Sequence, residues 1–498
     1  MSLSSASRIA QSGLNTVTAE ASVLSRNITG ASDTTTYSRK IANVITTLDG
    51  SRVASVTRAS NLAVFGNLLG ASSASAGQDA LSAGLDTLNQ TVGDVASSSS
   101  GTTSGASSPA ALLGNFTNSL QSYEASPSDS TLAAAAVAAA ATAARGLNSA
   151  AATVNQVREQ ADSGIATSVQ TINALLTKLQ PVNTQIINGT ATGSDVTDAQ
   201  DTRDNILTQL AQEIGITTTT GANGDMSVYT DSGVTLFQGG AARSVTFSAT
   251  NSYTAATAGN AVYADGVPVT GTSSTMPVTS GTIAGLATLR DDLAVTYQAQ
   301  LDGVAGALVT TFAESAQTGT GPNLPGLFTT PGATSPPTST TGLAGQISVN
   351  ASVDPTQGGN ALLLRDGGIS GNTNYIYNTN GDASYSTRLS QLLANLSAPQ
   401  PFGATGGITT NATLGGYASA SVSWLEAERS NVASQSTYQS TFLNTATTAL
   451  SNATGVNLDN EMSKMLDLER AYSATAKLIT TIDAMLGTLL ADYGSIPA

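Results

Sequence analysis

The sequence contains no cysteine and no histidine. Without cysteine the chain can form no disulfide, no thiol nucleophile and no zinc–thiolate site. Without histidine it lacks the commonest general base, so an active site would have to be built from carboxylates and hydroxyls. No lysine follows a glycine or lies three residues after a serine, which excludes a Gly-Lys phosphate loop and a Ser-x-x-Lys nucleophile. The sequence therefore predicts no catalytic residue and no enzyme.

Charged residues are also scarce, at 10% of the chain, and the net charge is −15. A nucleic-acid partner needs clustered lysine and arginine, so this excess of acidic residues argues against one. The longest apolar run, Leu132 to Ala144, is too short and too rich in alanine to span a bilayer. The first residues do not have the pattern of a signal peptide. We therefore expect no membrane partner and no cleaved signal peptide.

Two kinds of polar cluster in the sequence are candidate binding sites. The turns at 221–225 and 378–382 are rich in Gly, Asn and Asp, but neither has the spacing of a calcium-binding loop. Arg365–Asp366 and Glu426–Arg429 bring charges together, and solvated surface charge is the better interpretation for both. The sequence predicts no metal site and no cofactor.

Small residues dominate the chain, and against that background large apolar residues recur at every seventh position near the C-terminus. The first row is Leu458, Met465, Tyr472, Ile479, Leu486 and Tyr493, and Leu468, Ile482 and Leu489 follow three residues after three of its members. Such a narrow stripe is the a/d pattern of a coiled coil. It predicts a helix over 456–493, capped by Asn457, that needs a partner helix.

The N-terminus carries a second heptad pattern, with Leu3, Ala10, Val17 and Leu24 on one row and Leu14, Ala21 and Ile28 on the next. Alone in water this small-residue helix would be marginal, so it is the expected partner of the C-terminal helix. We predict that the two ends pair through an assembly seam of large apolar residues: Leu3, Leu14, Val17, Leu24, Ile28, Leu458, Met465, Leu468, Tyr472, Ile479, Ile482, Leu486, Leu489 and Tyr493.

Short motifs at both ends resemble those of bacterial flagellar axial proteins, the family of rod, hook and hook–filament junction subunits. At the C-terminus the resemblance lies in residues 456–462, 468–474, 476–477 and 482–486. At the N-terminus it lies in Ser12-Gly13-Leu14-Asn15, Asn27-Ile28 and Tyr37-Ser38-Arg39. The last triplet, together with Asp201-Thr202-Arg203-Asp204, is similar to the first hook–filament junction proteins, the hook-associated proteins 1.

The resemblance implies a structural subunit of the bacterial flagellum, which joins the hook to the filament. It also implies export by the flagellar secretion apparatus and assembly outside the cell. The implied partners are further copies of the chain, the hook protein, the second junction protein or flagellin, and a flagellar export chaperone. Two alternatives stay open: a flagellar hook or distal rod subunit, which would share both termini, and a secreted adhesin-like surface protein with an acidic, low-complexity body.

The middle of the chain predicts a mainly α fold with one small inserted β domain. Helical periodicity covers about 61–96 and 109–176, with a break at Pro127-Ser128-Asp129, and returns at 288–316, 388–396 and 417–453. Residues 41–58 predict a hairpin around Asp49-Gly50. Residues 97–108 and 319–345 predict surface loops, and Asp201 to Asp204 predicts a helix start with one internal ion pair.

From Ile214 the pattern changes to period two with many threonines, which predicts a β domain that faces outward as a knob. The second β insertion that the resemblance implies would not fit in 346–386, so an eroded or missing third domain is expected there. The predicted domains are a terminal coiled coil (1–45 with 454–498), a helical body (46–215 with 283–453) and the inserted β domain (216–282).

Overall fold

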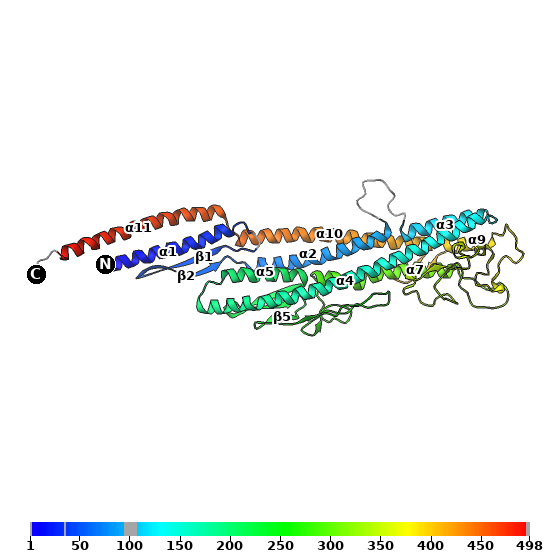
Figure 1. The fold of residues 1–498 in the computed structure, drawn as a ribbon, viewed down its shortest axis with the longest axis horizontal. Coiled ribbons are helices and arrows are strands. Elements are labelled where there is room, and N and C mark those ends of the chain that lie inside the picture. The colour runs from blue at the N-terminus through cyan, green and yellow to red at the C-terminus, as the bar shows by residue number, and fades with distance from the viewer. Residues whose placement is uncertain (1, 34–35, 94–106, 495–498) are drawn as a thin grey trace.

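A computed structural model describes residues 2–33, 36–93 and 107–494, the side chains of 492–494 excepted. The molecule is a long rod, with a slender terminal part at one end and a thicker helical body along the rest (Figure 1). Both ends of the chain lie at the slender end. The prediction of a mainly α fold with a small inserted β domain is confirmed. Most of the predicted loop at 97–108 lies outside the described residues.

The body is a bundle of long helices: α2 (Leu62–Asn89), α3 (Pro109–Ala125), α4 (Ser130–Thr192), α5 (Thr197–Glu213), α7 (Ala294–Thr311) and α10 (Leu414–Thr454). Side chains cap the first turns of α2, α3, α4 and α10; Asn61, for example, accepts from Val64 N and Asp129 from Thr131 N. The break between α3 and α4 lies where Pro127 predicts it. The prediction that the second helix ends near 176 is wrong, because its buried face continues to Ile186.

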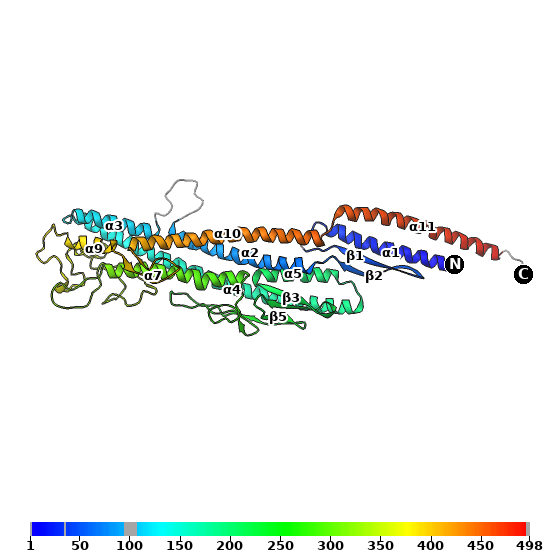
Figure 2. The same ribbon diagram turned by 180° about the vertical axis from the view of Figure 1, so that it is seen from behind.

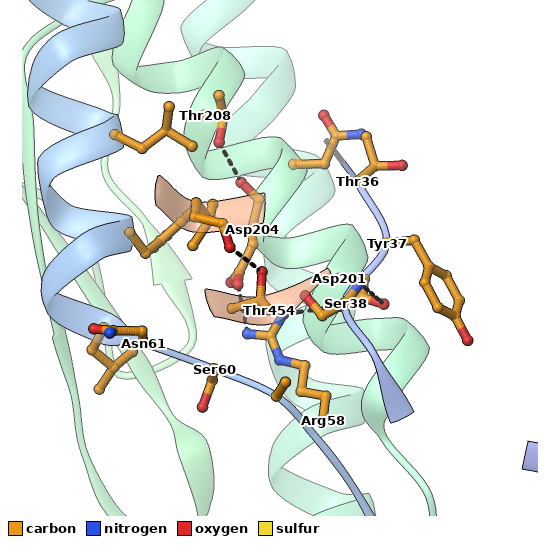
Figure 3. Close-up of a pocket in the computed structure, with 16 residues that line it drawn as sticks. Thr36, Tyr37, Ser38, Arg58, Ser60, Asn61, Asp201, Asp204, Thr208 and Thr454 are labelled. Atoms are coloured by element: carbon orange, nitrogen blue, oxygen red, sulfur yellow. Dashed lines mark hydrogen bonds and ion pairs between the residues drawn. The ribbon is translucent and has the colours of Figure 1, made fainter. Parts of the chain in front are cut away.

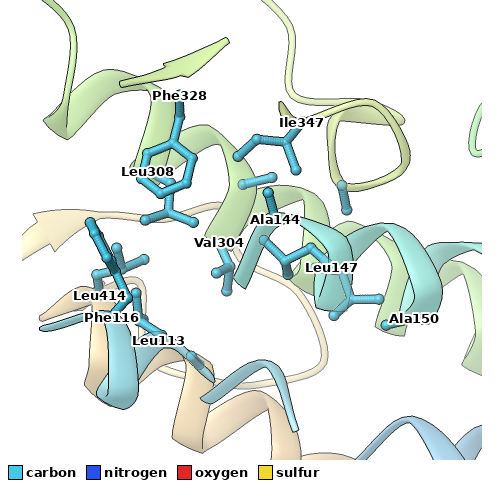
Figure 4. Close-up of a cluster of buried hydrophobic side chains, with 14 of the residues drawn as sticks. Leu113, Phe116, Ala144, Leu147, Ala150, Val304, Leu308, Phe328, Ile347 and Leu414 are labelled. Atoms are coloured by element: carbon cyan, nitrogen blue, oxygen red, sulfur yellow. The ribbon is translucent and has the colours of Figure 1, made fainter. Parts of the chain in front are cut away.

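Buried apolar side chains hold the far end of the body together (Figure 4). At its centre are three aromatic rings, Phe116 of α3, Phe312 just after α7, and Phe328 of β10 (Phe328–Thr329). Their centroids lie 5.3–5.5 Å apart, and the rings are tilted or edge-on to one another. The prediction that 319–345 is only a surface loop is therefore wrong, since Leu327 and Phe328 are fully buried.

The far end is closed by short irregular segments that lean on this cluster. They include β11 (Ser348–Val349), α8 (Leu363–Asp366), α9 (Thr387–Ser397), β12 (Gln400–Pro401) and β13 (Asn411–Ala412), with 3-10 turns at 343–345, 355–357 and 373–375. Within 346–386 the structure has one two-residue strand; buried Val353 and Ile369 lie in turns, and buried Leu364 lies in the short helix α8. A second β domain is not formed there; the segment is a cap on the bundle.

The inserted β domain has two small antiparallel sheets. One contains β3 (Ile216–Thr220), β4 (Met226–Thr230), β5 (Thr235–Gln238) and β6 (Ala241–Ala242); the other contains β7 (Val245–Thr246), β8 (Tyr263–Ala264) and β9 (Val267–Pro268). A 3-10 turn at 222–224 links β3 to β4. The sheets lie along α4 (Figure 1), and Val228 and Phe237 share one buried cluster with Leu176 and Leu179 of that helix. The expected outward knob is therefore wrong in this respect: the domain is a layer on the body.

Buried charges fasten this layer. The chain re-enters the body through α6 (Thr282–Thr288), a π turn at Leu289–Leu293 and then α7, so the predicted helix start near 288 is six residues late. The π turn places Arg290 inside, where it donates to Asp162 (2.6 Å) and to the Asn260 carbonyl (2.8 Å). Arg158 of α4 donates to the carbonyls of Arg290 and Thr254. Each buried guanidinium is hydrogen-bonded, as burial of a charged group requires. Arg290 bonds a carboxylate and a carbonyl, and Arg158 bonds carbonyls.

The terminal part contains α1 (Leu3–Gly30), the hairpin β1 (Lys40–Thr47) and β2 (Gly50–Arg58), and α11 (Leu458–Gly494). The predicted hairpin is confirmed, with Thr47 opposite Gly50 at its tip. Figures 1 and 2, seen from opposite sides, both place α1 between α11 and the hairpin. Asn457 caps α11 as predicted, its Oδ1 accepting from Asn460 N at 3.0 Å.

Candidate assembly site: the seam and the neck

The two terminal helices run antiparallel along each other. Asn27 near the end of α1 bonds Glu461 in the first turn of α11, and Gly13 in the middle of α1 faces Thr475. At one residue of α11 for each residue of α1, Leu3 lies level with about residue 485. α11 therefore extends past the start of α1 by its last two turns or so, which Figure 1 also shows.

The structure places the predicted seam residues at three levels of burial. Leu24 and Ile482 are buried. Partly buried are Leu3, Leu14, Val17, Ile28, Met465, Leu468, Ile479 and Leu486. Leu458, Tyr472 and Leu489 are about half exposed, and the side chain of Tyr493 lies outside the described residues. Leu489 belongs to the overhang, where α1 offers nothing to cover it.

The surface of the terminal part is unusually apolar. Among the described residues, sixteen large apolar side chains are exposed; eight belong to α11 and four to the hairpin. Those of α11 are Leu458, Met462, Leu466, Tyr472, Leu478, Met485, Leu489 and Leu490. Scattered single exposures need no explanation, but a concentration like this on one element marks an interaction surface.

Length and composition alone would let two stretches cross a membrane: α4, and α10 taken together with α11. The apolar window of α4 is 39% buried inside the body, as expected of a core helix. The window of the second stretch is 6% buried, and the helix is interrupted at 455–457. The second stretch is thus two helices, and its uncovered apolar side chains are those described above.

At the base of the seam, buried polar side chains tie α1, β1 and α11 together. Asn27 donates to Glu461 and to the Lys40 carbonyl, both at 2.9 Å, and its Oδ1 accepts from Lys40 N (2.8 Å) and the Tyr37 hydroxyl (3.0 Å). Arg39 Nε donates to the fully buried Glu461 carboxylate at 2.7 Å. Burial raises the pKa of Tyr37 to about 12, so this hydroxyl remains a donor.

The hairpin is bonded to the body through α5, and Figure 3 shows Arg58 of β2 beside Asp201 and Asp204. Lys40 Nζ, fully buried, contacts Asp201, and Arg58 donates to Asp201 at 2.9 Å and to Asp204 at 2.5 Å. Arg203 pairs with Asp204 at 3.2 Å, which confirms the predicted internal ion pair. The predicted helix start is wrong, because α5 begins at Thr197 and Asp195 accepts from Thr197 N. Asp201 thus faces the terminal part from the second turn.

We call this polar cluster the neck: Asn27, Arg39, Lys40, Arg58, Asp201, Asp204 and Glu461. Its members come from five separate stretches of the chain, and they meet where the slender part joins the body. Removing one partner of a buried ion pair costs about 3–5 kcal/mol, because the other charge is left uncompensated. The neck therefore sets one orientation of the terminal helices on the body.

Sequence reasoning did not predict the neck as a site. A signal was present, because Glu461 lies three residues after Leu458, in a d position that apolar residues otherwise fill. A carboxylate in that row predicts a buried partner. Lys40, at the first position of a strand, carried no comparable signal, since its burial depends on α5 arriving from 160 residues away.

The arrangement offers apolar helix surfaces and buried ion pairs. Among the described residues, no group of three or more carboxylates could hold a metal ion. The cavity beside Arg58 and Asp201 has a volume of about 40 Å³, which is room for a few waters. The seam and the neck together present the apolar surface of α11 in one fixed direction relative to the body.

Comparison with known proteins adds two family matches. Residues 99–327 match the model of the flagellar hook-associated protein FlgK helical domain, and residues 449–492 match that of the flagellar basal body rod FlgEFG protein C-terminal domain. Among solved structures, the flagellar hook junction protein FlgK from Burkholderia pseudomallei is 20% identical with a TM-score of 0.41. That match covers 53% of this chain and 46% of the other, so the chain spans less than half its length. No curated protein matches.

Proposed function

We propose that this chain, whose residues 99–327 match the FlgK helical domain, is a structural subunit that joins the hook to the filament. The observation that carries the proposal is the exposed apolar surface of α11 and the hairpin. A subunit that worked alone would gain nothing from these side chains. A subunit that assembles buries each of them against a neighbour, at about 1.5–3 kcal/mol for a full Leu or Met side chain.

The proposed division of labour follows the rod. Residues 1–45 with 454–498 form the assembling domain and contain the seam; 46–215 with 283–453 form the helical body, and 216–282 the β layer on it. The partners are other copies of the chain, the hook protein, and the second junction protein or flagellin, with an export chaperone before secretion. The proposed location is the extracellular flagellum, reached through the flagellar secretion apparatus, and the proposed role is not enzymatic.

A hook or distal rod subunit is the nearest alternative, since the match over 449–492 is to a domain of rod proteins. The match of 99–327 to the FlgK helical domain favours the junction. An adhesin-like surface protein would not need two chain ends brought together by a neck of buried ion pairs.

The test is a charge in the seam. Ile479, partly buried against α1, is changed to Asp, and exposed Thr480 is changed to Asp as the matched control. A carboxylate at 479 must be desolvated when the seam is covered, at a cost of several kcal/mol. We expect cells with Ile479→Asp to export the chain and to carry bare hooks, while Thr480→Asp cells carry filaments. Filaments in normal number on Ile479→Asp cells would contradict the proposal.

A further inference from the structure

The tip of the hairpin presents a leucine that nothing covers. Leu48 is 99% exposed, more than any other large apolar side chain among the described residues. The strand that leads away from it is firmly held, since Ser12 and Thr16 of α1 both donate to the Ser51 carbonyl, at 2.5 and 2.6 Å. Gly50, at φ +118°, packs so closely on Ser12 that no side chain would fit. The leucine is thus displayed on a rigid support.

A partly apolar groove, into which a leucine side chain would fit, lies at the opposite end of the hairpin, next to the neck. Val23 and Leu24 of α1 form its floor, and Ala42 of β1 and Leu468 of α11 form part of its walls. Its volume is about 250 Å³, several times the ~30 Å³ share of one water. The groove continues the seam, because the same two helices bound both.

The charges that line the groove are mixed, with Glu20, Glu461 and Asp467 against Arg39, Lys40 and Lys464, and the one carboxylate of the tip can be met at Lys464. Lys464 on the rim is half exposed, and its one ion-pair contact among the described residues is a long one of 3.9 Å to Glu461. Asp49, beside Leu48, makes no ion pair within the described part of the chain. Glu20 and Asp467 share the rim, so a tip with further negative charge would be repelled. One apolar side chain with one carboxylate beside it therefore fits this site.

We propose that the hairpin tip of one copy, Leu48 with Asp49, docks into this groove of a second copy, next to Lys464. The inference rests on the proposed function, which requires copies to assemble. A chain cannot fill its own groove, because six residues of extended strand put about 20 Å between Leu48 and Ala42. Tip and groove are different surfaces at opposite ends of one hairpin. Their contact is heterologous, and it repeats from copy to copy as an axial structure needs.

The test uses the absence of cysteine from the natural chain. A double variant, Leu48→Cys with Ala42→Cys, is expressed in place of the natural chain, and isolated flagella are oxidised. A disulfide requires Cα atoms within about 7 Å, so the two cysteines of one chain cannot pair. We expect a ladder of linked chains without reductant. The matched control, Leu48→Cys with exposed Ala54→Cys of β2, should give none.

A second experiment tests the charge match. In the double-cysteine background, Asp49→Lys should lower the linked fraction about fivefold, and adding Lys464→Asp should restore it. Flagella that contain the chain but give no ladder, or an equal ladder with Ala54→Cys, would overturn the docking and leave the proposed function standing. If the chain is absent from flagella, the proposed function fails. Oxidation of the concentrated purified double variant then decides the docking, and monomers alone would overturn it.

Discussion

The body and the terminal part use apolar residues in opposite ways. In the body, α4 packs against α3, α5, α7 and the β domain, and its inner face is fully buried. In the terminal part, α11 packs along no described helix or strand except α1, and most of its surface is open. The body thus covers its own apolar faces, whereas the terminal part leaves much of its apolar surface open to solvent.

Polar groups show the same contrast. In the body, Arg290 forms an ion pair with Asp162, and Arg158 donates to the backbone carbonyl of Arg290. All three side chains are buried. In the terminal part the buried charges are confined to the neck. Beyond it, toward the free end, the helices are joined by side chains that are mostly half covered. The two regions should respond differently to the changes below, which are ordered by the size of their expected effect on the isolated chain.

Deletion of the β domain, Ile216 to Ser280, with a short linker should have the largest effect. An outward knob could be removed at little cost, whereas removal of this β layer strips Leu176 and Leu179 of their cover. Each such side chain accounts for about 1.5–3 kcal/mol of burial, so cooperative melting of the body should be lost. Circular dichroism during heating measures it. Shortening the loop at 334–338 is the control, and an unchanged melt in the deletion would contradict the layered fold.

Phe116→Ala should come next, because it removes one ring of the buried aromatic trio. We expect the free energy of unfolding to fall by about 3–5 kcal/mol in urea titrations. Leu489→Ala, on the overhang of α11, should change it by less than about 0.5 kcal/mol. Equal losses at the two positions would mean that the isolated terminal part is as well packed as the body.

Alkaline pH should distinguish the two regions through tyrosine. Burial raises the pKa of Tyr297 to about 12, above the ordinary value of 10.0. The folded state thus holds this proton more tightly, and the stability it contributes is present below pH 10 and lost as the pH rises toward 12. Tyr297→Phe should remove about 2–3 kcal/mol of that alkaline loss, measured by urea titration at pH 9 and pH 12. Tyr472→Phe, on half-exposed α11, should leave the loss unchanged.

Asn27→Ala should act mainly on the terminal part. It removes the hydrogen bonds of Asn27 to Glu461 and to the Lys40 backbone, at about 1–3 kcal/mol. In amide exchange, 3–28 and 458–490 should already exchange faster than α4 in the isolated chain, and Asn27→Ala should speed them further with α4 unchanged. Asn15→Ala, an exposed position of α1, is the control. Strong protection of both terminal helices in the monomer would mean that the isolated terminal part is as well packed as the body.

The sequence was most informative where a period repeats. The heptads of 458–493 predicted α11 and its pairing, and the period-two pattern after Ile214 predicted the β domain. It was least informative where burial is decided by distant segments. Phe328 sits in a Pro- and Gly-rich run with no period, and only the approach of Phe116 and Phe312 makes it core. Lys40 and Asp201 are ordinary surface types that become buried because α5 meets β1. The position of the β layer likewise depended on α4 continuing beyond residue 176.

The overhang of α11 has a consequence for growth. Two helices paired antiparallel with flush ends would look much the same from either end. Here one end carries the neck and the body, and the other ends in a lone helix with Leu489 and Leu490 uncovered. In the proposed assembly, a stack of such units has two different end faces, one with uncovered helix and one with the folded body. The overhang of about two helical turns would then give the proposed assembly a direction.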